Sequence, residues 1–224
     1  MIFYDEGQAI KQCEDKPSLI FELIKQEYFE VVDKILSKKS FDINVSDDSG
    51  DNVLMKLLKL GQYDLVLKHM KNKKWHVNHQ NNNGNTFAHI LVTIDYLKVK
   101  NIIDTLKKRK DFIPNINNNN NETILDKSNY IYTTIKILED ERFNNIDTAG
   151  FYKLYKNYIK SNEYGRYSKL NNFEQIIKHL SKKEKLLPRL QLIVDTLVIN
   201  MTEIKKEIEE NNVTFIERMI TSFV

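Results

Sequence analysis

The stretch Gly84-Asn85-Thr86-Phe87-Ala88 has a similar stretch on either side of it in the chain. Gly50-Asp51-Asn52-Val53-Leu54 begins 34 residues earlier, and Asn121-Glu122-Thr123-Ile124-Leu125 begins 37 residues later. A second marker, an aliphatic residue followed by asparagine, recurs in the same phase, with offsets of 34 and 39 residues. Its copies are Asp42-Ile43-Asn44, His76-Val77-Asn78 and Asn115-Ile116-Asn117. Two markers that recur in phase indicate an internal repeat.

Apolar residues between the markers follow the period of an α-helix. Leu54, Leu57 and Leu58 are spaced by three residues and one residue, and a second run with helical spacing begins at Tyr63, just after Gly61. Each predicted helix is about ten residues long, which is too short to be stable alone in water. Such helix pairs can bury their apolar stripes only against a neighbouring copy, so the pattern predicts a stacked solenoid.

The repeated unit resembles the ankyrin repeat. Thr86-Phe87-Ala88-His89 is similar to the T-P-L-H turn of that family, and Gly61 matches its glycine between the two helices. Ile43-Asn44 and Val77-Asn78 match its V-N ending. The resemblance implies an all-α fold, an ankyrin-repeat solenoid of about four helix-turn-helix units followed by a C-terminal helical region. The four units are expected at Lys16–Val45, Asp48–His79, Asn82–Asn117 and Asn118–Asn145.

The copies depart from the family pattern at several positions. The turn proline is absent from all four copies, and the turn histidine is present only as His89. The glycine between the two helices is replaced by Glu27 in the first copy. We therefore expect divergent units, with the end units acting as caps that have polar outer faces.

Three segments are expected along the chain: an N-terminal segment at 1–15, the solenoid at 16–145, and a C-terminal helical domain or arm at 146–224. The last segment contains a heptad pattern of apolar residues at 187–208. Two interpretations of this pattern stay open. Packing of the tail helices on the end of the solenoid is favoured because it buries their apolar stripes. An oligomerisation arm is the alternative.

The chain carries no motif with the spacing of a catalytic or cofactor-binding site, so we expect neither an enzyme nor a cofactor. His76 and His79 lie three residues apart, but the only cysteine, Cys13, is far away in sequence, so no metal site is expected. One cysteine cannot form an internal disulfide, which favours a reducing compartment, the cytoplasm. No apolar run reaches the roughly 18 residues of a membrane-spanning helix, so no membrane is expected among the partners.

Basic clusters and Trp75 each have a functional and a structural interpretation. Basic residues gather at 68–74, 107–110 and 182–185, and a nucleic-acid-binding stripe would need such charges. Two clusters fall at the expected ends of second helices, where cations meet the helix dipole favourably, so nucleic acid is the less favoured partner. Trp75 is either an exposed hot spot or packing between repeats, and we favour packing because its ring buries a large area.

The resemblance implies a concave surface, made of the first helices and the tips of the loops before them, that binds another protein. The candidate contact residues are Asp47, Asp48, Lys56, Lys59, Asn81, Asn82, Ile90, Thr93 and Asn118. Short polar residues on a rigid scaffold can recognise a protein by hydrogen bonds and shape. We therefore expect a protein–protein interaction module, whose partner the sequence does not identify.

A structural role in a larger assembly is the alternative function. The chain uses Asn, Lys and Ile heavily, and all three residues have A/T-rich codons. Divergent ankyrin proteins with this bias resemble those of large DNA viruses and other A/T-rich genomes. On that interpretation the chain is a viral protein of the host cytoplasm or the virion, where it acts as a minor structural component.

Overall fold

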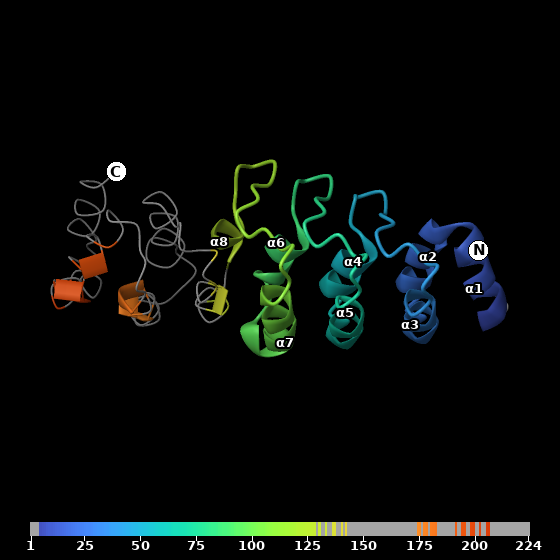
Figure 1. The fold of residues 1–224 in the computed structure, drawn as a ribbon, viewed down its shortest axis with the longest axis horizontal. Coiled ribbons are helices and arrows are strands. Elements are labelled where there is room, and N and C mark those ends of the chain that lie inside the picture. The colour runs from blue at the N-terminus through green and yellow to red at the C-terminus, as the bar shows by residue number, and fades with distance from the viewer. Residues whose placement is uncertain are drawn as a thin grey trace. The chain divides into compact units, whose positions relative to one another are not determined.

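The computed structural model (Figure 1) describes residues 5–128 without interruption. Beyond them it describes positions 130, 133, 136–137, 140, 142, 174–175, 177–178, 180–182, 191, 194–195, 198–199, 202 and 205–206. The expected fourth repeat after residue 128 and the heptad pattern at 187–208 fall mainly outside the described residues. Both therefore stay predictions.

The chain divides into two compact units, Met1–Thr123 and Ile124–Val224. In order, the described elements are α1 (Glu6–Asp15), the 3₁₀ turn η1 (Pro17–Leu19), α2 (Ile20–Lys25), α3 (Phe29–Leu36), α4 (Val53–Lys59), α5 (Tyr63–His69), α6 (Phe87–Leu91), α7 (Tyr96–Lys107) and α8 (Ile124–Lys127). All of them except α8 belong to the first unit. The domain boundaries expected at residues 15 and 145 stay predictions.

Helices of the first unit pack as pairs in two rows. α2 contacts α3, and α4 contacts α5. The first members of the pairs form one row, in which α4 contacts both α2 and α6, and the second members α5 and α7 are also adjacent. Helix α1 packs against α3 at the start of the unit. Three long loops project from the same side of these pairs (Figure 1).

The regular elements of the described residues are all helices, and the loops between them contain two isolated antiparallel bridges, Ser46–Asn52 and Gln80–Thr86. The prediction of an all-α fold is therefore confirmed for this part of the chain. Leu23, Leu57 and Val66, on three different helices, are completely buried, and this burial stabilises helices that would not form alone.

The two turns that join α2 to α3 and α4 to α5 have the same backbone geometry. Glu27 and Gly61 lie in the left-handed region, with φ angles of 61° and 74°. In both turns, the N–H of the following residue donates to a carbonyl five residues earlier, at 3.0 Å. This hydrogen bond is typical of a helix that ends in a left-handed residue. Glycine adopts that conformation freely, whereas Glu27 adopts it at an energetic cost.

An aromatic ring is buried in each segment that leads from a second helix to the next loop. Phe41, Trp75 and Phe112 are 6%, 1% and 5% exposed. The rings of Trp75 and Phe87 meet edge-on, with centroids 4.9 Å apart, and the Arg109 guanidinium carbon lies 5.2 Å from the Trp75 ring centroid. The interpretation of Trp75 as packing between repeats is confirmed by this burial.

The third copy of the second sequence marker lies in a different register from the one predicted. The N–H of His76 donates to Asn44 Oδ1 at 2.7 Å, and the N–H of Ile113 donates to Asn78 Oδ1 at 2.9 Å. Ile113 therefore takes the place of His76, and the third copy begins there, not at Asn115. The prediction was wrong because the asparagine-rich stretch that follows imitates the marker. All repeated positions then share one offset of 37 residues between the second and third copies.

Candidate binding face

Three loops of the first unit close with the same turn, and one side chain organises each turn. Asp47, Asn81 and Asn118 hold that position. In each case Oδ1 accepts the backbone N–H groups of the residues two and four places further along, at 2.9 to 3.0 Å. Aspartate and asparagine recur here because both carry an oxygen at the length that this local hydrogen bonding requires.

Each turn also contains a left-handed residue three places after the organising side chain. Gly50, Gly84 and Asn121 have φ angles of 75°, 73° and 62°. The two glycines leave room for the next loop as well. A Cβ on Gly50 would lie 2.7 Å from the backbone nitrogen of Asn82, and one on Gly84 would lie 2.6 Å from that of Asn119. The glycines therefore set the close approach of neighbouring loops.

A row of hydrogen bonds joins the loops to one another. The backbone N–H of Asn82 donates to the Ser49 carbonyl at 3.1 Å, and its Nδ2 donates to the Asp48 carbonyl at 2.9 Å. Asn119 repeats both contacts one loop further along, with the carbonyls of Asn83 and Asn82, at 3.1 and 2.9 Å. The three loops consequently form one hydrogen-bonded edge.

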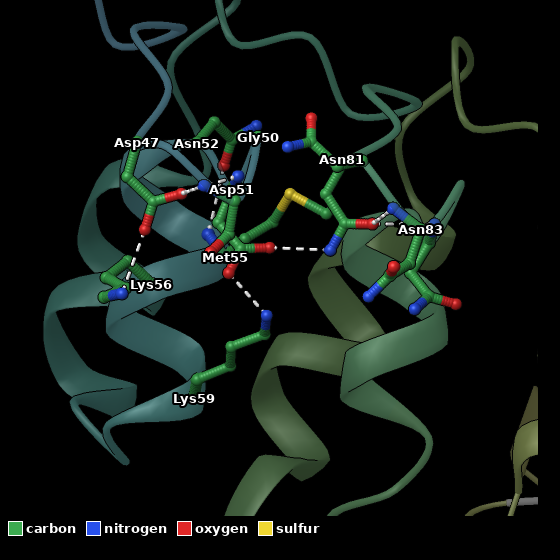
Figure 2. A network of polar contacts seen from close by, with 12 residues as sticks. Asp47, Gly50, Asp51, Asn52, Met55, Lys56, Lys59, Asn81 and Asn83 are labelled. Carbon is green, nitrogen blue, oxygen red and sulfur yellow. Dashed lines mark hydrogen bonds and ion pairs between the residues drawn. The ribbon is translucent and has the colours of Figure 1, made fainter.

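A second set of contacts ties the loops to helix α4 (Figure 2). Asn81 Nδ2 donates to Asp51 Oδ1 at 2.7 Å, and the Lys59 ammonium pairs with the other oxygen of Asp51. Lys56 pairs with Asp47 Oδ2 at 2.9 Å. Partial burial raises the pKa of Asp47, but the hydrogen bonds from Lys56 and from two backbone N–H groups outweigh it, so this pKa lies below its usual value. Two carboxylates of the first loop, those of Asp47 and Asp51, are therefore paired with lysines from the helix that follows it.

Five of the expected contact residues are engaged in turns or ion pairs inside the molecule, and Asp47, which organises the first turn and pairs with Lys56, is one of them. Asn81 and Asn118 are only 8% and 6% exposed, because their amide groups hold the turns from within. Their expected place on the exposed loop tips was wrong. Lys56 and Lys59 extend toward the loop carboxylates, as Figure 2 shows, and are not free cations on the first-helix face.

Other expected contact residues lie at the surface of the first unit. Asp48, Asn82 and Thr93 are exposed, and Ile90 is half-buried. The hydroxyl of Thr93 donates to the Ile90 carbonyl at 2.8 Å. As contact residues for a partner, these four stay predictions.

His89 of α6 and His79 of the second loop make hydrogen bonds with the backbone. His89 Nδ1 accepts the N–H of Thr86 at 3.1 Å, which leaves the proton on Nε2, and Nε2 donates to the Glu122 carbonyl at 3.0 Å. His79 Nε2 contacts the Gly50 carbonyl at 2.7 Å. Among the described residues, no group of three or more His, Cys, Asp or Glu side chains could hold a metal ion. No helix of that part of the chain is long and apolar enough to cross a membrane.

A groove of about 500 Å³ opens between α2 and α4, beside the first loop. Four apolar side chains line it, those of Phe21, Ile24, Phe29 and Leu60. Four carboxylates and two lysines share the lining with them. Of the expected contact residues, the structure brings Asp47, Asp48 and Lys56 to this groove. Apolar and charged groups thus meet on one concave surface.

Sequence reasoning missed the apolar half of this groove. Phe29 and Leu60 lie at helix ends, where the helical period assigns no face, and only the contact between α2 and α4 places them on one surface. Glu27 carried the one available signal, because it stands where the next repeat has Gly61. The sequence showed this substitution as a departure from the repeat but did not explain why glutamate stands there.

Comparison with known proteins adds no assignment. No family model matches the chain, and no curated protein and no solved structure matches it either. What the chain does is therefore inferred from its own geometry.

Proposed function

We propose that the chain is a divergent ankyrin-repeat protein whose first-helix face binds another protein without catalysis. Three features support the ankyrin assignment: the sequence repeat, the helix pairs packed in two rows, and the loops that share one turn. His89 supports it as well. It accepts a hydrogen bond at the start of its own helix and donates one to the next loop, so the residue at the turn-histidine position links neighbouring units.

The groove between α2 and α4 is the observation that carries the binding proposal. It is concave, half-apolar, and bounded by helices and a hydrogen-bonded loop edge, so a partner can dock with little reordering of the chain. Leu60 remains 48% exposed in its wall. Burial of this side chain under a partner would remove apolar surface from water and favour the complex.

Affinity capture with a groove variant tests the proposal. The full chain, its Leu60→Glu variant and its Ile113→Glu variant are used as bait in extracts of the source cells, and captured proteins are quantified by mass spectrometry. Ile113 is a matched control because it is an apolar side chain, 55% exposed, that does not line the groove. We expect at least one protein to be captured by the wild type and by Ile113→Glu, and to be lost with Leu60→Glu.

Two outcomes would contradict the proposal. Equal capture by all three baits would show that the groove is not the binding surface. Recovery in a fixed ratio with proteins of a particle, unaffected by Leu60→Glu, would favour the structural role instead. Circular dichroism of each bait shows whether the fold has survived the substitution.

A further inference from the structure

The lining of the groove between α2 and α4 is suited to an apolar side chain next to a charged one. Phe21 and Phe29 are half-buried and Leu60 is 48% exposed, so their outer faces meet solvent in the groove. Carboxylates of Glu22, Glu27 and Asp48 share the same walls. A long cationic side chain matches this pattern, because its methylene stem packs on apolar surface while its head reaches polar groups.

The charge of the groove is opposite to that of the chain. The full sequence carries a net charge of +3, whereas the groove has four carboxylates and two lysines. One of these lysines, Lys56, is already paired with Asp47. Among the described residues, Glu22, Glu27 and Asp48 have no ion pair. Three carboxylates are thus available to a ligand, and Lys25 is the one groove lysine that would oppose a cation.

Glu27 adds a separate observation. It holds a φ of 61° in a turn where the next repeat has glycine, so the backbone carries a cost that glycine would remove. Strained positions of this kind persist where the side chain serves a purpose. Here the side chain supplies one of the unpaired carboxylates of the groove.

We infer that the groove binds a short segment of a partner protein that presents lysine or arginine beside an apolar side chain. The cation meets Glu22, Glu27 and Asp48, and its stem and the apolar neighbour cover Phe21, Phe29 and Leu60. The rings of Phe21 and Phe29 add a cation–π contribution for a guanidinium or ammonium group. This inference rests on the proposed protein-binding function and names the chemistry of its partner. An anionic partner, such as nucleic acid, is repelled by the same carboxylates.

A random peptide display library, selected on the full chain and depleted on the Leu60→Glu variant, tests this chemistry directly. We expect the retained peptides to be enriched in Lys or Arg next to Leu, Ile, Phe or Met. The most enriched peptide is then synthesised with a fluorescein label, and its dissociation constant is measured by fluorescence polarisation. Because exposed ion pairs are weak, each of Glu22→Gln, Glu27→Gln and Asp48→Asn should weaken binding by about two- to fivefold. Raising the salt concentration should weaken it further.

Matched controls separate the groove from the general charge of the chain. Glu30 is an exposed carboxylate on α3 that does not line the groove, so Glu30→Gln should leave the dissociation constant unchanged. Replacing the peptide cation by glutamate should abolish binding to the wild type and restore part of it with Glu22→Lys. All these substitutions lie at exposed positions, and circular dichroism and a thermal melt confirm that each variant is folded.

The inference and the proposed function can fail separately. The inference is overturned if the retained peptides lack Lys and Arg. It is also overturned if the three neutralising substitutions leave the dissociation constant unchanged. Either result would leave groove binding itself intact. The inference is also overturned if no peptide distinguishes the wild type from Leu60→Glu, and affinity capture then still decides the proposed function. A dimer in light scattering that Leu60→Glu dissociates would mean that a second copy fills the groove, which likewise overturns it.

Discussion

Two regions of the first unit hold neighbouring repeats together by different forces. The loop edge, residues 47–51, 81–85 and 118–122, is joined by side-chain amides and backbone N–H groups. The connector row, Phe41, Trp75 and Phe112, is joined by buried rings. Hydrogen bonds are directional and contribute little net energy each, whereas ring burial is non-directional and contributes more.

The difference explains which residues of the repeat can vary. The three copies of the loop edge have Asp or Asn at the first position and Gly or Asn three places later, because the turn requires one side-chain oxygen and one left-handed residue. The connector row accepts either Phe or Trp, because any large ring can exclude water. Register is therefore set at the loop edge, and stability is supplied mainly at the connector row. Substitutions at Trp75 and Gly84 test that division, and substitutions at His69 and Glu27 test two contacts outside both regions, in order of decreasing expected effect on stability.

Removal of the Trp75 ring should cause the largest loss in the free energy of unfolding. We expect Trp75→Ala to lower the free energy of unfolding by about 3–5 kcal/mol, the usual loss when a buried aromatic side chain is cut to alanine. Urea unfolding followed by circular dichroism measures this, since Trp75 is the only tryptophan and fluorescence is lost with it. Tyr28→Ala is the control, because Tyr28 is an aromatic residue that is 48% exposed. If the two variants lose the same free energy of unfolding, then the connector row is not the main source of stability.

A methyl group on Gly84 should disturb the loop edge by about 2–3 kcal/mol. Two causes act together, the positive φ of 73° and the backbone of Asn119 at 2.6 Å from the new Cβ. Gly61→Ala separates them, since Gly61 has a φ of 74° but meets only the Tyr63 ring, at 3.8 Å or more. We expect this control to lose about 1 kcal/mol. If both variants lose the same free energy in urea unfolding, then the close approach of the loops does not set their spacing.

Acid should destabilise the folded chain through His69, whose side chain joins α5 to Asp33 of α3. Burial lowers the pKa of His69 below its usual value, and the hydrogen bond from its Nε2 to Asp33 Oδ1, at 2.6 Å, raises it by less. Just below pH 6.5 the unfolded chain therefore binds a proton more readily than the folded chain, so stability falls as the pH drops from 7 toward 5.5. We expect His69→Gln to flatten this dependence, measured as urea midpoints across that range.

Asp33, the partner of His69, loses its proton in a lower pH range. Its pKa is lowered mainly by the hydrogen bond from Lys68, so its contribution is lost only below about pH 4 and does not overlap with that of His69. An unchanged slope in His69→Gln would assign the pH dependence to another group.

Glycine at position 27 should change the free energy of unfolding least, and it should raise it where the other substitutions lower it. Glu27→Gly relieves the left-handed residue in the α2–α3 turn and should stabilise the chain by about 0.5–1 kcal/mol. The same variant should weaken binding of the labelled peptide by about two- to fivefold, because it removes a groove carboxylate. Glu30→Gly, within α3, should instead destabilise by about 0.5–1 kcal/mol. A loss of stability in Glu27→Gly would show that the left-handed turn carries no strain.

Part of the candidate site could be predicted from the sequence and part could not. The repeat placed Asp48 and Asn82 on exposed loops, and the structure agrees. It also placed Asn81 and Asn118 there, although both are buried. The two pairs have the same polarity and adjacent positions, so no local signal distinguishes them. The burial of Asn81 and Asn118 accompanies a contact with the preceding loop, where their amide groups donate to Asp51 and Asn85.

By itself, the sequence determined the helix pairs, the positions of the loops, and the residue types that each turn requires, because all of these depend on contacts within a few residues. Only the tertiary structure decided the register of the third copy, the pairing of Lys56 and Lys59 with loop carboxylates, and the groove that unites Phe29 with Leu60. Each of these depends on how neighbouring helices or loops meet. Such contacts join residues brought together by packing, and no local periodicity encodes them.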